Sequence, residues 1–238
     1  TMAVLATRIL ESRRERIIAV TLLALAIPCS AQLGVILALL STVSAAAVLV
    51  ITGIIVGEFF LVGAILSRVL KGGTSDFILE LPPLRTPRAG NILLKTGARV
   101  KWFLREALPF FLLATFILYL LDVSGSLQLL FRVAEPVTGT LLGLPPETAA
   151  VFILGFFRRD YGAAGLYKLW ESGAVAGNQI VVALVVMSLF LPCLATLIVM
   201  IKELGVRWAF SILFFVLVVS LLTGAALHLV LSLTGVSL

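Results

Sequence analysis

Two cysteines in this sequence each follow a proline inside an apolar run, and the residues around them repeat. Both stretches fit the pattern L-x-[IL]-P-C-x-A-x-L, which places Cys29 after Pro28 and Cys193 after Pro192. A thiolate beside hydroxyl or carboxylate oxygens suits Fe(II), Cu or Zn better than it suits alkali ions. The pattern therefore indicates soft metal ligands. A second interpretation stays open, because Cys is also a common small buried residue and Pro a common kink in membrane helices.

Each proline also loosens the backbone beside its cysteine. It removes one N–H and clashes with the carbonyl four residues earlier, that of Ala24 in the first copy and that of Ser188 in the second. In hydrocarbon, a freed carbonyl needs a neighbouring helix, a water molecule or a cation as its partner. Ser30, Gln32 and Thr196 add polar side chains close to the kinks. Because secondary transporters bind ions at broken helices of this kind, we expect ion binding here.

Ionisable side chains also interrupt other apolar runs. Glu58 stands deep in one run, and Arg158, Arg159 and Asp160 end another. A charge inside a membrane is costly and usually functional, which favours a role in an ion pathway. The alternatives are that Asp160 pairs with one arginine at an interface, and that Glu58 is protonated or paired with a neighbouring helix. His228 is more simply a contact between helices than a ligand.

The elements that carry these residues must be membrane helices. Of the 238 residues, 61% are hydrophobic and 13% are charged, and the mean hydropathy is +1.19. A soluble domain has about 45–50% apolar and about 25% charged residues. Charge-free stretches cover residues 17–57, 107–121, 172–201 and 208–238, and about 20 apolar residues cross a bilayer. The sequence excludes a soluble enzyme and carries no GxxxxGK[ST], GxSxG or HExxH motif. We expect an all-α polytopic protein with about five or six transmembrane helices.

The expected order of elements divides the chain into four parts. The first, 1–70, is a helical hairpin with spans at 17–40 and 45–66. The second, 71–106, is a basic cytoplasmic loop containing an interfacial amphipathic helix over 91–106. The third, 107–146, holds a short span at 107–121 and a partly helical outer loop. The fourth, 147–238, holds an apolar piece at 148–157, a span at 174–201 broken by Pro192, a short loop around Lys202, Glu203 and Arg207, and a last span at 208–231.

Two features of this order concern direction. The piece that ends at Arg158 is too short to cross alone, so it is either part of a full crossing or a re-entrant half-helix. The first copy of the Pro-Cys motif has its basic flank before the span, whereas the second has Lys202 and Arg207 after it. If basic flanks face the cytoplasm, the copies run in opposite directions and form an inverted repeat. The net charge of +6 then reflects anionic lipid rather than nucleic acid.

Four stretches, in the right order, resemble the ferrous iron transporter B family (FeoB). They are residues 2–16 with Pro28–Leu33, Leu79–Arg85 with Asn91–Lys95, Gly155–Asp160 with Gly162–Leu166, and Pro192–Leu197. The resemblance covers nearly the whole chain. The chain is similar to the carboxy-terminal membrane (gate) region of that family. The family's amino-terminal GTP-binding domain and first membrane helices are not in this sequence. Gln32 stands where many members have Arg, and Asp160 replaces Glu.

The resemblance implies Fe2+ uptake across the plasma (inner) membrane by a multi-pass permease that is not itself an enzyme. It implies Cys29 and Cys193 as metal ligands, Ser30 and Thr196 as auxiliary oxygens, and Asp160 and Glu58 as charge-compensating carboxylates. Pro28 and Pro192 would break the helices, with Gln32, Arg158 and Arg159 lining the pathway. Fe2+ is then the substrate, and GTP with Mg2+ acts only through the GTPase part. Expected partners are that GTPase part, the early membrane helices, the bilayer and a second copy of the chain.

Two other functions remain open from the sequence. The first is an organic solute permease of the nucleoside type, which Asn178, Gln179 and Gln32 support through their amide groups. The second is a membrane assembly protein in which the repeat only packs helices.

Overall fold

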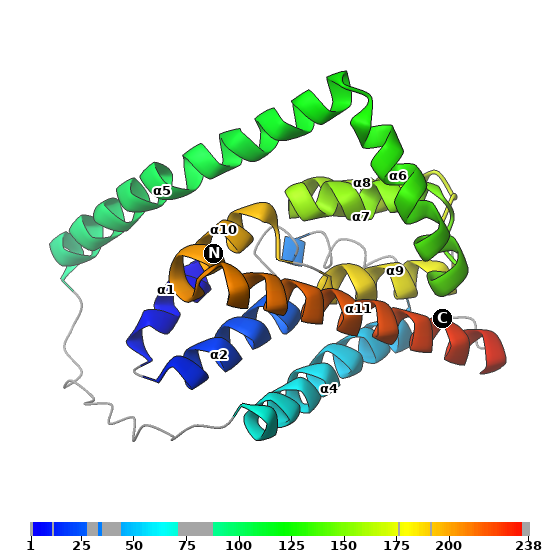
Figure 1. Ribbon diagram of the computed structural model, residues 1–238, viewed down its shortest axis with the longest axis horizontal. Helices are drawn as coiled ribbons and strands as arrows, with labels where there is room; N and C mark the ends of the chain where they lie inside the picture. Colours follow the sequence, from blue (N-terminus) through cyan, green and yellow to red (C-terminus); the bar gives the residue numbers. More distant parts are fainter. Residues whose placement is uncertain are drawn as a thin grey trace.

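The computed structural model describes residues 2–10, 12–27, 33–34, 44–70, 88–175, 177–190 and 192–234, and within these ranges it contains helices and no strand (Figure 1). The expected all-α class is thereby confirmed. The elements in chain order are α1 (Met2–Ala6), the 3-10 turn η1 (Thr7–Ile9), α2 (Arg13–Ala26), α4 (Ala45–Val69), α5 (Ala89–Val123), α6 (Ser126–Pro136), the π-helical turn η2 (Val137–Leu141), α7 (Glu147–Phe157), α8 (Arg159–Glu171), α9 (Asn178–Leu189), α10 (Leu194–Leu204) and α11 (Val206–Thr234).

Several of these helices are long and apolar enough to cross a membrane. Within the described ranges they are α4, the broken pair α9 and α10, and α11, and a fourth span arises if the 90° bend between α5 and α6 lies within one crossing. The protein is therefore a polytopic helical membrane protein. The first span expected from the sequence, 17–40, begins as α2, and most of its second half lies outside the described residues.

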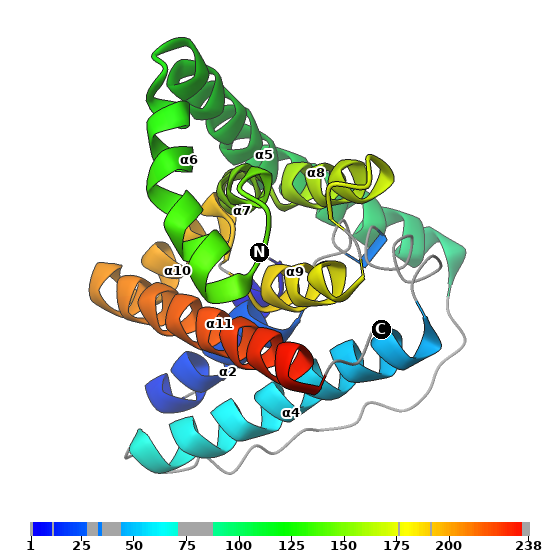
Figure 2. The same ribbon diagram turned by 90° about the vertical axis from the view of Figure 1, so that its right-hand side faces the viewer.

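Helix α9 forms the centre of the bundle. Every residue from Ile180 to Leu189 is buried, which is the behaviour of a helix that is apolar all round. It contacts α2, α4, α8 and α11, and Figure 2 shows it between α8 and α11. No charged residue occurs in α9, so every charge near the centre must come from a neighbouring helix.

The repeat seen around the cysteines extends to whole helices. Pro28 and Pro192 are 164 positions apart. A shift of 164 moves the bounds of α2 onto 177–190, almost those of α9, and the bounds of α4 onto 209–233, inside α11. The contacts between helices repeat in the same way. Within the copies, α2 contacts α4 and α9 contacts α11. Between the copies, α2 contacts α11 and α4 contacts α9. Two copies of one helical unit related by an approximate two-fold axis would make these contacts.

Helix α5 differs from the sequence expectation. The amphipathic helix over 91–106 and the span over 107–121 are one helix of 35 residues that runs through Pro109. A proline inside a helix removes only one hydrogen bond, and neither a glycine turn nor a proline pair separates the two segments. Gly125, with φ of +70°, ends the straight run and starts α6. Figure 1 shows α5 extending away from the bundle at its beginning.

The segment after η2 folds back on itself. Helix α7 ends where Arg158 is extended, and α8 begins at the next residue. A Cβ on Gly162 would lie 2.6 Å from the Cα of Gly155, and one on Gly165 would lie 3.1 Å from a methyl group of Val151. The later residue of α8, Gly165, thus meets the earlier residue of α7, Val151. Helices α7 and α8 therefore run antiparallel and form a hairpin. The chain therefore turns back at Arg158, as a re-entrant half-helix would, and its position relative to the membrane stays a prediction.

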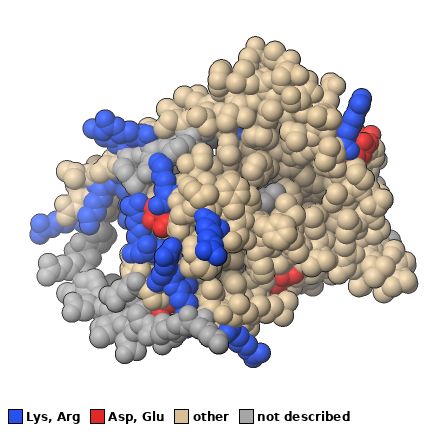
Figure 3. Space-filling view, viewed as in Figure 1, with Lys and Arg blue, Asp and Glu red and all other residues tan. Residues whose placement is uncertain are grey.

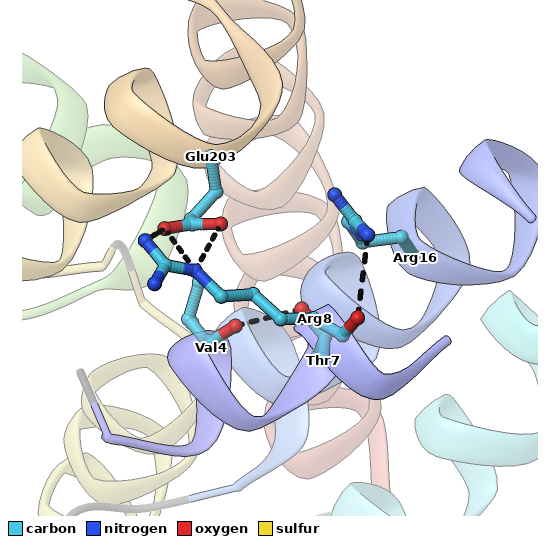
Figure 4. Close-up of polar contacts among 5 residues, drawn as sticks. All are labelled: Val4, Thr7, Arg8, Arg16 and Glu203. Atoms are coloured by element: carbon cyan, nitrogen blue, oxygen red, sulfur yellow. Dashed lines mark hydrogen bonds and ion pairs between the residues drawn. The ribbon is translucent and has the colours of Figure 1, made fainter. Parts of the chain in front are cut away.

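Basic residues gather at one end of the molecule. Figure 3 shows most of the Lys and Arg side chains on the side that carries α1, the start of α5 and the end of α10. At this end Arg14 donates to the carbonyl of Ser67 at 2.6 Å, and Arg8 forms an ion pair with Glu203 (Figure 4). The start of α2 therefore lies near the ends of α4 and α10. The loop expected around Lys202 is shorter than predicted, because only Gly205, with φ of +90°, separates α10 from α11.

Candidate functional site

The second Pro-Cys motif lies at a break between two helices. Helix α9 ends at Leu189 and α10 begins at Leu194, as the buried Pro192 predicts. Cys193 is the N-cap residue of α10, and its carbonyl accepts the first helical hydrogen bond, from Leu197 N–H at 2.9 Å. The end of α9 presents carbonyl oxygens to the break, and the start of α10 presents N–H groups. The helix dipole favours a cation at the α9 side.

A cationic side chain already binds at that α9 side. Arg159, the first residue of α8, donates from Nη2 to the carbonyl oxygen of Phe190 at 2.9 Å. The ring of Phe190 packs against that of Phe152 on α7, with centroids 5.5 Å apart. Met187 lies against Gly155 and Gly162. The α7–α8 hairpin therefore covers the end of α9 and places a guanidinium on its exposed backbone.

Two candidate ligands meet on the other side of the break. The Cys193 Sγ atom lies 3.3 Å from Thr196 Oγ1, and both side chains are half-buried. Metal–sulfur and metal–oxygen bonds of about 2.3 Å and about 2.1 Å would let both atoms bind one ion at close to a right angle. Both residues are candidate ligands from the sequence, and their joint binding of an ion stays a prediction. Cys193 is a free cysteine.

The acidic residue at the turn of the hairpin, Asp160, is paired with a neighbouring arginine. Asp160 Oδ2 accepts from Arg158 Nη2 at 2.6 Å. Arg158 also donates to Thr115 Oγ1 on α5 at 3.2 Å and lies 4.1 Å over the ring of Tyr161. Asp160 therefore pairs with one arginine, while its role in an ion pathway stays a prediction. The pair holds the turn of the hairpin against α5 and neutralises one of the two arginines.

The remaining expected carboxylate lies elsewhere in the bundle. Glu58 on α4 accepts a short hydrogen bond from Thr223 Oγ1 on α11. Its second oxygen, Oε2, is buried and has no hydrogen-bond partner among the described residues. His228 on α11 packs its ring against Gly143, in the segment between η2 and α7, at a distance where no Cβ would fit. Thr223 was not expected from the sequence, although a threonine inside an apolar run is a weak signal for such a partner.

The first copy of the motif falls outside the part of the chain that the structure describes. This applies to Pro28, Cys29, Ser30 and Gln32. Within the described ranges, no three His, Cys, Asp or Glu side chains come together in a way that could hold a metal ion. The ligand set proposed from the sequence, which joins the two copies of the motif, stays a prediction.

Two family models match separate parts of the chain. The fold is that of a polytopic helical membrane protein, and the second Pro-Cys motif lies at a break between two of its helices. Residues 46–99 match the family model described as ferrous iron transport protein B C terminus, and residues 104–207 match the model Gate, described as nucleoside recognition. The chain is thus similar, over most of its length, to proteins of the FeoB family.

Curated relatives named Fe(2+) transporter FeoB align with most of this chain. The one from Methanocaldococcus jannaschii is 26% identical over 87% of this chain and 36% of the relative. The one from Synechocystis sp. is 28% identical over 88% of this chain and 37% of the relative, and one from Staphylococcus aureus strain COL is 24% identical over 84% and 34%. The chain thus spans about a third of the length of these relatives. No solved structure matches it significantly.

Proposed function

We propose that this chain is the membrane permease part of a ferrous iron uptake transporter of the plasma (inner) membrane. The observation that carries the proposal is the break at Pro192, where α9 ends and a thiol and a hydroxyl lie 3.3 Å apart at the start of α10. The names of the relatives supply the ion. In the full protein, a GTP-binding domain with Mg2+ regulates or drives opening, and it is the expected partner together with the early membrane helices.

The pathway in this proposal passes between the two kinked units. Cys29 and Cys193 are the soft ligands of Fe2+, and Ser30 and Thr196 supply auxiliary oxygens. Carbonyls freed at Pro28 and Pro192 complete the coordination. Asp160 balances charge through Arg158, and Glu58 balances charge between α4 and α11.

Further polar residues line this pathway in the proposal. Arg159 donates a hydrogen bond to the carbonyl oxygen of Phe190. A passing cation would also be attracted to this oxygen. Gln32, Arg158 and Arg159 therefore flank the ions without binding them directly.

The central test replaces both sulfurs. Cys29→Ser with Cys193→Ser in the full-length transporter is expected to abolish Fe2+ flux into proteoliposomes, because serine lacks the soft donor atom. Thermal unfolding should stay close to that of the unmodified protein. Unchanged Fe2+ flux in the folded double variant would remove the two cysteines from the pathway.

A matched pair of threonine changes tests the auxiliary oxygen. Thr196→Val removes the hydroxyl beside Cys193 and should lower Fe2+ flux severalfold. Thr234→Val removes an exposed hydroxyl near the end of α11 and should leave the flux unchanged. Equal effects of the two changes would count against a ligand role for Thr196.

One observation favours a second candidate, a permease for nucleosides. The family model for residues 104–207 carries the description nucleoside recognition. One of the amide groups that would suit such a substrate already bonds internally, since Gln179 Nε2 donates to the Gly143 carbonyl at 3.1 Å.

A ligand at 100 times its Kd stabilises the folded state by about 2.7 kcal/mol. Anaerobic Fe2+ should therefore raise the melting temperature of the purified protein, and nucleosides should not. The opposite result would favour the second candidate, and a response to neither would favour an assembly role.

A further inference from the structure

The first segment of the chain, residues 2–10, lies beside α2 and α10 at the basic end of the molecule. It consists of α1 and η1, and it contacts both of these longer helices. Val4 and Thr7 are buried, whereas Ala6 and Ile9 are exposed. One side of the segment therefore packs on the bundle, and the other side faces away from it.

Polar contacts join this segment to both helices. Arg8 Nε donates to both carboxylate oxygens of Glu203, in the last turn of α10, at 2.9 Å. Arg16 Nη2, from the first turn of α2, donates to the carbonyl oxygen of Leu10 at 3.2 Å. Figure 4 shows Arg8 with Glu203 on one side and Arg16 on the other. The segment therefore bridges the start of α2 and the end of α10.

The segment has little stability of its own. Helix α1 has five residues, and isolated helices shorter than about 12–15 residues are marginal in water. Its position therefore depends on its contacts with α2 and α10. The Arg8 side chain is 62% exposed, whereas that of Glu203 is 6% exposed. Water can thus replace Glu203 around Arg8 at little cost, and it reaches the carboxylate only once Arg8 has left.

Helix α10 is a short rod between two non-helical joints. Cys193, at the break that precedes it, is extended, and Gly205, with φ of +90°, alone separates it from α11. Hinge movements are absorbed by residues at the ends of such elements. Eleven residues make a rod about 16 Å long. A tilt at the Glu203 end therefore also moves Cys193 and Thr196 at the other end.

We propose that residues 2–10 form a latch on α10, closed by the pair of Arg8 and Glu203. While the latch is closed, α10 is braced at its basic end and the break keeps its geometry. When Arg8 leaves Glu203, the segment lifts from α2 and α10, α10 tilts about Gly205, and Cys193 becomes more accessible to water. The gating of an ion by this opening rests on the proposed function, whereas the latch itself does not.

Cysteine labelling tests whether the latch opens in the folded protein. In a chain with Cys29 and Cys193 replaced by serine, Thr7→Cys places a thiol on the buried side of the segment, and Val185→Cys places one in the buried centre of α9. A water-soluble maleimide should label Thr7→Cys more than about tenfold faster than Val185→Cys, because the first site opens locally and the second only on unfolding. Equal rates would overturn the proposal.

A change of one carboxylate tests whether the ion pair closes the latch. Glu203→Gln keeps the shape of the side chain and removes its charge, so the labelling rate of Thr7→Cys should rise about tenfold. Glu135→Gln alters an exposed carboxylate of α6 and should leave the rate unchanged. The exchanged pair, Arg8→Glu with Glu203→Arg, should restore slow labelling. An unaltered rate in Glu203→Gln would show that the pair does not close the segment.

The native thiol of Cys193 reports on the far end of α10. In a chain with Cys29 replaced by serine, Glu203→Gln should raise the labelling rate of Cys193 severalfold, and Glu135→Gln should not. A rate at Cys193 that ignores Glu203→Gln would show that the pair fixes the first segment alone, and the coupling to α10 would be refuted.

Fe2+ flux by the full-length transporter tests the link to transport. If the latch opens in each transport cycle, Glu203→Gln should raise the flux while it lowers the melting temperature. A pair that only stabilises the fold would make both fall together, so an unchanged or reduced flux refutes the link. If the unmodified protein carries no Fe2+, the proposed function fails, and the labelling results still decide whether the latch exists.

Discussion

A single arginine satisfies the backbone at the broken helix. Arg159 donates to the carbonyl of Phe190, and Pro192 prevents α9 from continuing to supply that carbonyl with a helical partner. Hydrogen bonds from charged groups contribute about 1.5–3 kcal/mol, and an acceptor left buried without a donor loses a similar amount. Arg159 is thus a positioning residue for the break, because it acts on the backbone beside Cys193 rather than on an ion.

Replacing this arginine should loosen the break. Arg159→Gln is expected to lower the melting temperature by about 3–10 °C, from a loss of about 1.5–3 kcal/mol. Arg159→Lys keeps the charge and one donor, so it should recover part of the loss. Circular dichroism during heating of the purified protein measures both.

A neighbouring cation provides the control for this change. Lys168→Gln alters an exposed basic residue of the same helix and is expected to shift the melting temperature by less than about 2 °C, since exposed charges contribute about 0–1 kcal/mol. Identical effects of the two glutamine variants would show that the contact with Phe190 contributes nothing.

The sequence predicts single residues well where the signal is local. The Pro-Cys pattern predicts the break at Pro192 and places Cys193 and Thr196 beside it, because all of these residues lie within about one helical turn. The depth of Glu58 in an apolar run predicts that it needs a proton or a partner. The partner itself, Thr223, is 165 residues away, and no local pattern carries that information.

At the scale of elements, two glycines allow the α7–α8 hairpin to close. A Cβ on Gly162 would lie 2.6 Å from the Cα of Gly155 and 2.9 Å from the carbonyl oxygen of Val151. Both are backbone atoms, which cannot move without separating the helices. Gly162→Ala is therefore expected to destabilise the protein by about 1–3 kcal/mol through overpacking and to lower its melting temperature.

The control for this variant is a glycine with open surroundings. A Cβ added to Gly97 on α5 would meet no neighbouring atom within 4 Å, so Gly97→Ala should be neutral or stabilising by up to about 1 kcal/mol. A stable Gly162→Ala protein with unchanged protease resistance at the hairpin would contradict the close approach of α7 and α8.

The ends of helices were predictable, and their directions were not. The break after Phe157, the turn at Gly125 and the kink at Pro192 all follow from residue type. Whether the chain crosses or returns after Arg158 depends on packing of α7 against α8, and charge alone does not decide it. The continuity of α5 was missed because its basic first half and apolar second half differ in composition while sharing helical propensity. The division into four parts stays a prediction.

At the scale of the whole molecule, one ion pair ties the beginning of the chain to the second unit. Arg8 donates from Nε to both oxygens of Glu203 at 2.9 Å, and the carboxylate side chain is 6% exposed while that of the arginine is 62% exposed. Exposed pairs contribute about 0–1 kcal/mol, and burial of one partner raises the cost of breaking them. A double-mutant cycle with Arg8→Ala and Glu203→Ala should give a coupling free energy of about 0.5–2 kcal/mol, measured by thermal unfolding at low and high salt. A coupling that does not fall with salt would contradict an electrostatic origin.

The gathering of basic residues at one end also fixes how the protein should lie in the membrane. Positive residues flank the cytoplasmic ends of membrane helices, and this end holds the ion pair of Arg8 and the first turn of α11 with Arg207.

Helix α11 has 29 residues, about 43 Å at about 1.5 Å per residue, which exceeds a hydrocarbon core of about 30 Å. We therefore expect its two ends to face opposite sides. In a protein with Cys29 and Cys193 replaced by serine, Arg207→Cys should react with an impermeant maleimide only from the cytoplasmic side, and Thr234→Cys only from the outer side. Both positions are exposed, so low reactivity from burial is avoided. The reverse pattern would invert the orientation, and labelling of both positions from one side would show that α11 does not cross, which would remove the last membrane span from the proposed permease.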